Sequence, residues 1–124
     1  MTPMYKIARK GQNPTKRIVK LIGLSSDPRL QHFLLQRSPD SVFKSICNAF
    51  YNIAENPDIQ IPKGRRIKLA KYNKVIQKLI AKDIPLVRKR RIIQRGGGIF
   101  LAAILPAVIS TALSYLGSSF IKNQ

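Results

Sequence analysis

A basic element is joined directly to an apolar one in residues 88–116, RKRRIIQRGGGIFLAAILPAVISTALSYL. The basic element holds four consecutive cations at positions 88–91 and a fifth cation, Arg95. Three glycines follow at positions 96–98, and because glycine favours no single backbone conformation we expect them to end the basic helix and to act as a hinge. The uncharged residues 99–116 have about the length of a membrane-spanning helix. The stretch therefore predicts a polyanion-binding helix, a hinge and an apolar helix.

An excess of basic residues is found over the whole chain and is not confined to this stretch. The 124 residues include 23 lysines and arginines but only five aspartates and glutamates, which gives a formal net charge of +18. Self-repulsion of this size opposes compaction unless an anionic partner supplies counter-charge, so nucleic acid and anionic lipid are the candidate partners. A chain of this length corresponds to one domain at most and can bury only a modest core.

Helical periodicity organises the middle of the chain. We expect a short helix over residues 29–36 and a second helix that starts with Ser38 as N-cap and Pro39 in the first turn. The second helix is expected to stop at the Asn56-Pro57-Asp58 sequence. Its apolar side chains recur at spacings of three and four residues and predict one buried face, formed by Val42, Phe43, Ile46, Cys47, Phe50, Ile53 and Ala54.

A third helix is predicted from Ile61 to about Lys82, with apolar and basic side chains on nearly opposite faces. The apolar face consists of Leu69, Tyr72, Ile76, Leu79 and Ile80, and the basic face of Lys71, Lys74, Lys78 and Lys82. No acid lies between Lys63 and Lys82, although a solvated helix usually mixes charges of both signs. We interpret the lysines as an anion-binding face; the alternative is the solvated side of a helix that packs on the core. A fourth helix follows Asp83-Ile84-Pro85.

These basic elements suit the phosphates of a nucleic acid. Each cation that neutralises a phosphate releases counterions, which gives binding that is sensitive to salt and independent of sequence. No recognition helix for base readout is visible, so backbone contacts to double-stranded DNA are the prediction. The predicted nucleic-acid-binding residues are Lys71, Lys74, Lys78, Lys82, Arg88, Lys89, Arg90, Arg91 and Arg95.

Two interpretations of the apolar residues 99–116 stay open: a membrane-active helix, and a helix buried in a core or in an oligomer. Small residues at helical spacing form one stripe and would let another helix approach closely. Larger apolar residues lie more nearly opposite, and Pro106 would kink the helix or mark its start. The residues expected to contact a membrane or a second copy are Ile99, Phe100, Leu101, Leu105, Val108, Ala103, Ala107, Ser110 and Ser114.

Catalysis has little support in the sequence. His32 is the only histidine, Cys47 is the only cysteine and belongs to a different predicted helix, and the five acids are scattered. No spacing typical of a zinc site occurs, and the three glycines lack the Lys-Ser/Thr of a phosphate loop. We predict no enzyme activity, no metal and no cofactor.

Taken together, these patterns predict an all-α protein in three parts. We expect residues 1–28 to form a flexible basic arm, with a helical turn in the short apolar patch of residues 18–22 before Gly23, and the rest of the arm to stay disordered until it is bound. Residues 29–95 form a basic helical domain. Residues 96–124 contain the glycine hinge and the apolar C-terminal helix.

The order of a basic run, an Arg-Gly-Gly sequence and a proline-containing, alanine-rich apolar tail resembles the virion core protein X family of adenoviruses. The upstream pattern is similar to longer relatives encoded by adintoviruses and by Polinton (Maverick) elements. The first resemblance is carried by Arg88-Lys89-Arg90-Arg91, Arg95-Gly96-Gly97-Gly98-Ile99 and Leu105-Pro106-Ala107, and the second by Leu34-Leu35, Ile46-Cys47-Asn48-Ala49, Asn52-Ile53 and Lys68-Leu69-Ala70-Lys71-Tyr72.

The resemblance implies a late structural protein that is packaged with viral DNA in the virion and is present in the host nucleus during assembly. Capsid proteins, or other copies of this chain bound through the C-terminal helix, are the implied protein partners. It also implies processing by a viral cysteine protease, for which Gly96, Gly97 and Gly98 are the candidate site, with cleavage before Gly98. The alternatives are a membrane-active or membrane-anchored basic protein without a DNA role, and a small ribosomal or chromatin protein.

Overall fold

The computed structural model describes residues 14–25, 27–56, 58–95 and 103–121. Every regular element within these ranges is helical, which confirms the predicted all-α class. The helices are α2 (Pro14–Leu24), α3 (Pro28–Gln36), α4 (Asp40–Glu55), α5 (Lys63–Lys71), α6 (Asn73–Ile80), α7 (Leu86–Gln94) and α8 (Leu105–Leu116).

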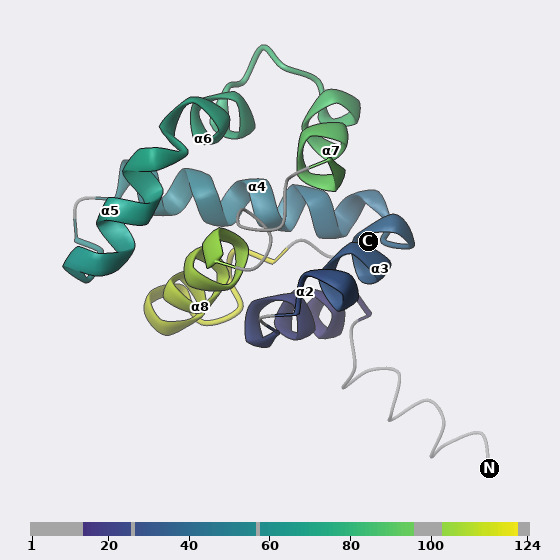
Figure 1. Ribbon diagram of the computed structural model, residues 1–124, viewed down its shortest axis with the longest axis horizontal. Helices are drawn as coiled ribbons and strands as arrows, with labels where there is room; N and C mark the ends of the chain where they lie inside the picture. Colours follow the sequence, from purple (N-terminus) through teal and green to yellow (C-terminus); the bar gives the residue numbers. More distant parts are fainter. Residues whose placement is uncertain (1–13, 26, 57, 96–102, 122–124) are drawn as a thin grey trace.

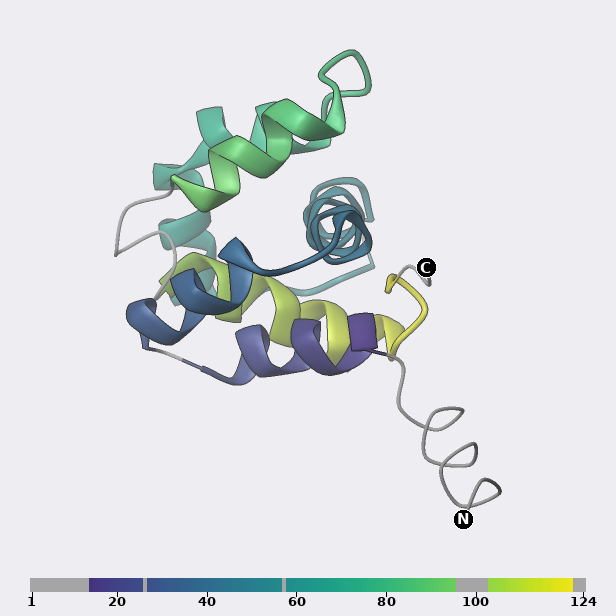
Figure 2. The ribbon, with the colours of Figure 1, turned by 90° about the vertical axis from the view of Figure 1, so that its right-hand side faces the viewer.

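Helix α4 lies between two layers of other helices. In Figure 1 it runs horizontally, with α6 and α7 above it and α2, α3 and α8 below. The view turned by 90° shows α4 end-on and the two layers on either side of it (Figure 2). Helices α2, α6, α7 and α8 all pack directly on α4, so this one helix joins both halves of the core.

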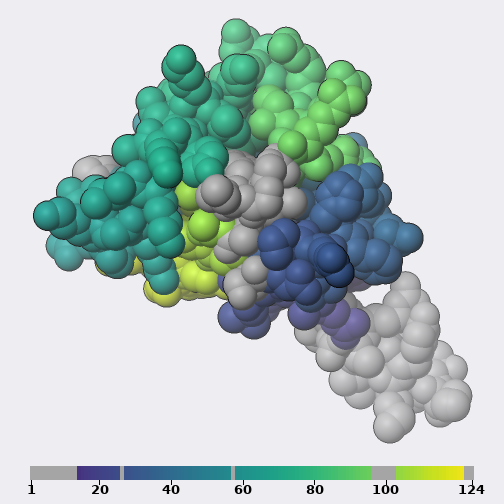
Figure 3. Space-filling model, in the orientation of Figure 1, coloured from purple at the N-terminus to yellow at the C-terminus, as the bar shows by residue number. Residues whose placement is uncertain are grey.

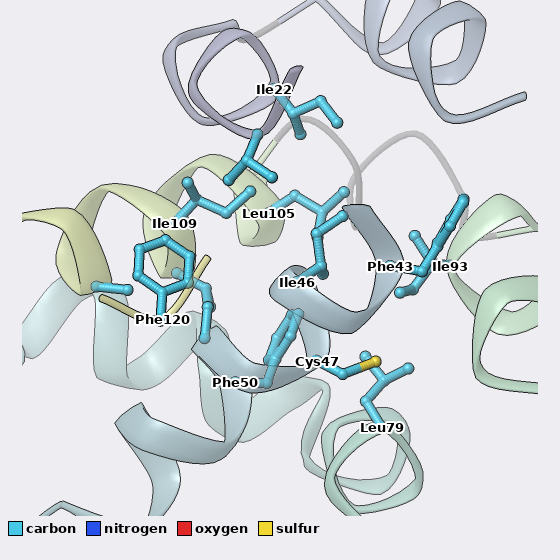
Figure 4. Packing of buried hydrophobic residues seen from close by; sticks show 14 of the residues in the cluster. Ile22, Phe43, Ile46, Cys47, Phe50, Leu79, Ile93, Leu105, Ile109 and Phe120 are labelled. Atoms are coloured by element: carbon cyan, nitrogen blue, oxygen red, sulfur yellow. The ribbon is translucent and has the colours of Figure 1, made fainter. Parts of the chain in front are cut away.

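This double contact explains why α4 is buried more widely than the single predicted face. Phe43 and Cys47 face Ile93 and Leu79 of the upper layer, whereas Ile46 points towards Leu105 of α8 (Figure 4). The contact between α4 and α2 includes a polar pair: Ser41 Oγ lies 2.7 Å from Thr15 Oγ1, and both residues are buried. Buried hydroxyls must be hydrogen-bonded to avoid a desolvation cost, and this pair satisfies that requirement.

The start of α4 differs from the predicted cap. Pro39 rather than Ser38 is the N-cap residue, and it makes no side-chain cap hydrogen bond. Ser38 Oγ instead donates to the Leu34 carbonyl, 2.6 Å away, at the end of α3. Helix α3 has a side-chain cap, since Asp27 Oδ1 accepts a hydrogen bond from Arg29 N at 3.0 Å. Ser38 is thus a residue type suited to an N-cap, but its hydroxyl bonds to the end of α3 instead of to the start of α4.

The predicted helix from Ile61 to Lys82 is two helices. The backbone leaves helical geometry at Tyr72, where φ is −108° and ψ is 21°. Helix α6 buries Ile76 and Leu79, but no residue of α5 is buried. Because five of the nine residues of α5 are cations, it has too few apolar side chains to continue the packed face of α6.

The predicted flexible arm also needs correction. Residues 14–24 form helix α2, in which Val19 and Ile22 are fully buried. The short apolar patch around these two side chains is enough to hold the helix because it packs on both α4 and α8. The remainder of the predicted arm, residues 1–13, lies outside the described residues.

The apolar C-terminal helix is part of this core rather than a separate element. Leu105, Val108, Ile109 and Ala112 of α8 are buried together with residues of α2 and α4 (Figure 4). After α8, Gly117 adopts a positive φ of 60°, which glycine tolerates without a steric cost. Past this turn Phe120 is buried as well, and its carbonyl accepts a hydrogen bond from Asn48 Nδ2 at 2.8 Å.

Helix α8 reaches this position through a close approach to α2. Ser110 Oγ donates to the Gly23 carbonyl at 3.2 Å, and Ile109 lies directly against Gly23. The predicted small-residue stripe therefore does allow a helix to approach closely at Ser110, and the approaching helix belongs to the same chain. Within the described residues, no helix is both long enough and apolar enough to cross a membrane.

Replacing Gly23 with alanine is expected to destabilise the protein. The new Cβ would lie 2.5 Å from Ile109 Cγ2 and 3.1 Å from Ile109 Cβ, and this β-branched side chain is fully buried. Overpacking costs about 1–3 kcal/mol, whereas alanine gains about 1 kcal/mol in helix propensity. We expect the free energy of unfolding, measured by urea denaturation, to fall by roughly 1 kcal/mol.

Gly64→Ala is the matched control. A Cβ at Gly64 would meet nothing within 4 Å, so this variant should gain up to about 1 kcal/mol from helix propensity alone. Equal stabilisation by both substitutions would contradict the close approach of α2 and α8.

The substitution Leu105→Ala tests whether α8 is buried in the core or exposed, as a membrane-facing helix would be. Because Leu105 is fully buried, its truncation should lower the free energy of unfolding by about 2–5 kcal/mol. Ser114→Ala, at an exposed position of the same helix, should change that free energy by no more than about 0.5 kcal/mol. Similar unfolding curves for the two variants in lipid-free buffer would argue against burial of α8.

Candidate nucleic-acid interface

Most cations of the described chain lie on α5, α6, α7 and the turns between them. Thirteen basic residues and a single acid, Asp83, occur from Lys63 to Arg95. In the space-filling view these helices form one continuous rim, from α5 at the left to α7 at the upper right (Figure 3). We call this region the basic rim. Among the described residues, its only ion pair is that between Arg90 and Asp40.

The four consecutive cations of α7 point in three directions. One helical turn takes about 3.6 residues, so Arg88, Arg91 and Arg95 share one side of the helix, whereas Lys89 and Arg90 lie on others. The predicted nine-residue set is therefore not a single surface.

Arg90 is engaged by its own protein. Its Nη1 donates to Asp40 Oδ1 at 2.7 Å, and its guanidinium lies over the Phe43 ring, 4.8 Å from the centroid. Both contacts tie α7 to the start of α4. A partly exposed pair of this kind stabilises by at most about 1 kcal/mol, and it leaves Arg90 less available to an external phosphate than its neighbours.

Lys89 lies beside the single cysteine. Both residues line a hollow of about 290 Å³ between α4, α6 and α7, together with Lys44 and Tyr51. Burial raises the pKa of the Cys47 thiol to about 11, and the positive charge of Lys89 only partly opposes this shift. Because the thiolate is the nucleophile, Cys47 is unreactive at neutral pH, as expected of a small buried hydrophobe.

Arg88, Arg91 and Arg95 come together with Lys78 of α6 around one hollow. Its volume is about 360 Å³, and Ile92 completes its lining. No acid lines it, and in the described part of the chain none of its four cations forms an ion pair. All four cations are exposed. We call this feature the four-cation hollow.

The other predicted lysines are exposed but dispersed. Lys71 is the last residue of α5, Lys74 lies in the first turn of α6, and Lys82 follows α6. None of the three lines the four-cation hollow. The break at Tyr72 and the end of α6 at Ile80 divide the predicted lysine face among three segments.

Helix α5 adds cations that the predicted site did not include. Lys63, Arg65, Arg66 and Lys68 are all exposed. Arg65 Nη1 donates to Thr111 Oγ1 at 3.0 Å, which anchors α5 on α8. Two features of the sequence could have identified these residues: the absence of acids between Lys63 and Lys82, and the low apolar content of residues 63–71.

His32 and Cys47, the only histidine and cysteine of the sequence, lie on different helices and differ in exposure. His32 is exposed on α3, whereas Cys47 is buried in α4. Within the described ranges, no group of three or more histidines, cysteines, aspartates or glutamates could hold a metal ion.

The predicted membrane or oligomer contacts are divided by burial. Leu105 and Val108 belong to the core, Ala103, Ala107 and Ser110 are half-buried, and Ser114 is exposed. The remaining predicted contacts, Ile99, Phe100 and Leu101, lie outside the described residues, as do the hinge and processing-site residues Gly96, Gly97 and Gly98.

Comparison with known proteins identifies no relative. No family model, no curated protein and no solved structure matches this chain.

Proposed function

We propose that this protein binds double-stranded DNA through phosphate contacts made by the basic rim, without reading sequence and without catalysis. The observation that carries the proposal is the charge of the rim: thirteen cations and one acid between Lys63 and Arg95, with one ion pair in the described chain. Cations without acidic partners are available to phosphates. Their neutralisation by a polyanion would also relieve the repulsion that they exert on one another.

The scaffold supports this function because the rim is held on a packed core. Helices α6 and α7 pack on α4 through buried Ile76, Leu79 and Ile93, which keeps their polar sides outward. Side chains on a rigid element lose less conformational freedom on binding than side chains on an unfolded segment. The rim therefore suits binding to a regular, highly charged surface such as a duplex.

The resemblance to virion core protein X extends the proposal to a setting. A late protein packaged with viral DNA would neutralise part of the phosphate charge inside the particle. It would be found in the virion and, during assembly, in the host nucleus. This part of the proposal depends on two resemblances alone: that to protein X over the last third of the chain, and that to the adintovirus and Polinton relatives over roughly residues 30–116. Duplex binding depends instead on the charge and placement of the rim.

The C-terminal helix enters the proposal as part of the scaffold. Its larger apolar side chains pack against α2 and α4, so membrane insertion by this helix would require it to leave the core. Surfaces for capsid proteins or for a second copy would then lie elsewhere on the molecule. The exposed side chains of Leu21, Leu24, Leu30 and Phe33 on α2 and α3 are among the apolar groups available for such contacts.

Neutralising three rim lysines is expected to weaken duplex binding. The triple variant Lys71→Gln, Lys74→Gln and Lys82→Gln removes exposed charges that line neither the four-cation hollow nor the core. Each lost phosphate contact should reduce the slope of log K against log salt by about 0.9. Fluorescence anisotropy over a salt series, with two duplexes of unrelated sequence, should show the same loss for both.

The control variant removes equal charge from the opposite layer. Arg17, Lys20 and Arg29 are exposed on α2 and α3, which lie on the other side of α4 from α6 and α7 (Figure 2). Their replacement by glutamine should change the salt slope less than the rim variant does. Equal losses in both triple variants would show that only net charge matters, and strong discrimination between the two duplexes would reject a purely phosphate-based mode.

A further inference from the structure

The four-cation hollow is distinguished on the basic rim by the number of cations that it brings together. At the α5 end of the rim Lys63 and Arg66 line another hollow as a pair, whereas here Lys78, Arg88, Arg91 and Arg95 surround one concavity. Its volume of about 360 Å³ lies within the range of about 300–1,000 Å³ that is typical of small-molecule sites. The cations come from two helices that pack against each other, α6 and α7, so the arrangement is fixed by the fold.

The phosphates of a duplex could contact only some of these four cations at one time. Its phosphates lie on the outside of a convex cylinder, with one charge per about 1.7 Å of axis, so few of them could enter a concavity at one time. A compact molecule that carries several phosphates could instead place charge against all four cations. Arginine is suited to such a ligand, because its planar guanidinium can donate two parallel hydrogen bonds to one phosphate.

We infer that the four-cation hollow is a discrete binding site for a compact polyphosphate, a small molecule or headgroup that carries three or more phosphate groups. Arg88, Arg91 and Arg95 would donate to the phosphates from one side of α7, and Lys78 would supply a point charge from α6. Ile92 provides the apolar part of the lining. The site goes beyond the proposed duplex binding, since loss of the duplex contacts made by Lys71, Lys74 and Lys82 would leave its lining intact.

Charge alone would favour occupation of the site. Four cations around one hollow repel each other, and no acid in the lining offsets this repulsion. A bound polyphosphate reduces the repulsion, and only the folded chain brings these four cations together. The ligand should therefore bind the folded chain more tightly than the unfolded chain and raise the melting temperature. The same ligand would compete with a duplex for Arg88, Arg91 and Arg95, and would thereby weaken DNA binding.

The test uses the full chain and inositol hexakisphosphate as the soluble probe, measured by isothermal titration calorimetry and by thermal melting. The wild-type chain should bind one equivalent with saturation. The double variant Arg91→Gln and Arg95→Gln should weaken binding by about tenfold or more, because it removes two charge-assisted contacts. The control Lys71→Gln and Lys74→Gln removes the same charge from exposed positions outside the hollow and should weaken binding less than about threefold.

A second arm distinguishes a soluble polyphosphate from a lipid headgroup. Phosphatidylcholine vesicles that contain phosphatidylinositol bisphosphate replace the soluble probe in a flotation assay. Binding to either probe that is lost in the Arg91/Arg95 variant supports the site and identifies the source. Equal weakening by both double variants, or the absence of one-to-one saturation with both probes, would overturn it. Loss of duplex binding in the Lys71/Lys74/Lys82 variant with unchanged polyphosphate binding would show that the two activities are separate.

Discussion

Burial of α4 from two opposite directions is the constraint on which the rest of the structure depends. The chain has a modest supply of large apolar side chains, and a helix that is covered on both sides can contribute different side chains to each of the two layers. Phe43 and Cys47 serve the layer of α6 and α7, while Ile46 serves the layer of α8 (Figure 4). Loss of either layer would expose one side of α4, so the two layers should fold together. The exposed position of α5, which buries no residue, is consistent with this because α5 lies outside both layers.

The same constraint determines where the charge can go. A core that occupies both sides of α4 leaves mainly the outer sides of the flanking helices for the cations of the described residues. On α7 this separation is visible within a few residues, since Ile93 is fully buried while Arg91 and Arg95 line the four-cation hollow. Acids offset little of this charge, because the Arg90–Asp40 contact is the one ion pair in the described part of the chain. The packed core and the exposed cationic surface are thus two consequences of one distribution of side chains.

The sequence predicted correctly those features that depend on neighbouring residues along the chain. Residues 29–36 and the apolar periodicity of α4 were sufficient for helices α3 and α4, and the acid-free stretch after Lys63 was sufficient for the basic rim. The short patch at Val19 and Ile22 lay within a polar, basic segment, and its burial depends on α8, more than 80 residues later. Helix α5 ends at Tyr72 because α6 is packed on the core and α5 is not. The periodicity of a single predicted helix does not show which of its segments will be packed. Arg88, Arg91 and Arg95 share a helix side by spacing alone, but only the fold brings Lys78 to them.

The packing of α8 also changes what cleavage at residues 96–98 would do. If the glycines were only a hinge between independent parts, a cut there would release the apolar tail. Instead, Leu105, Ile109 and Ala112 are buried against α2 and α4, and Asn48 and Gly23 hydrogen-bond to the segment from Ser110 to Phe120. A nicked chain would therefore hold together through its core, as two fragments of one folded unit. Release of the tail would require unfolding of the α2–α4–α8 core, so a cut alone could not transfer this helix to a membrane.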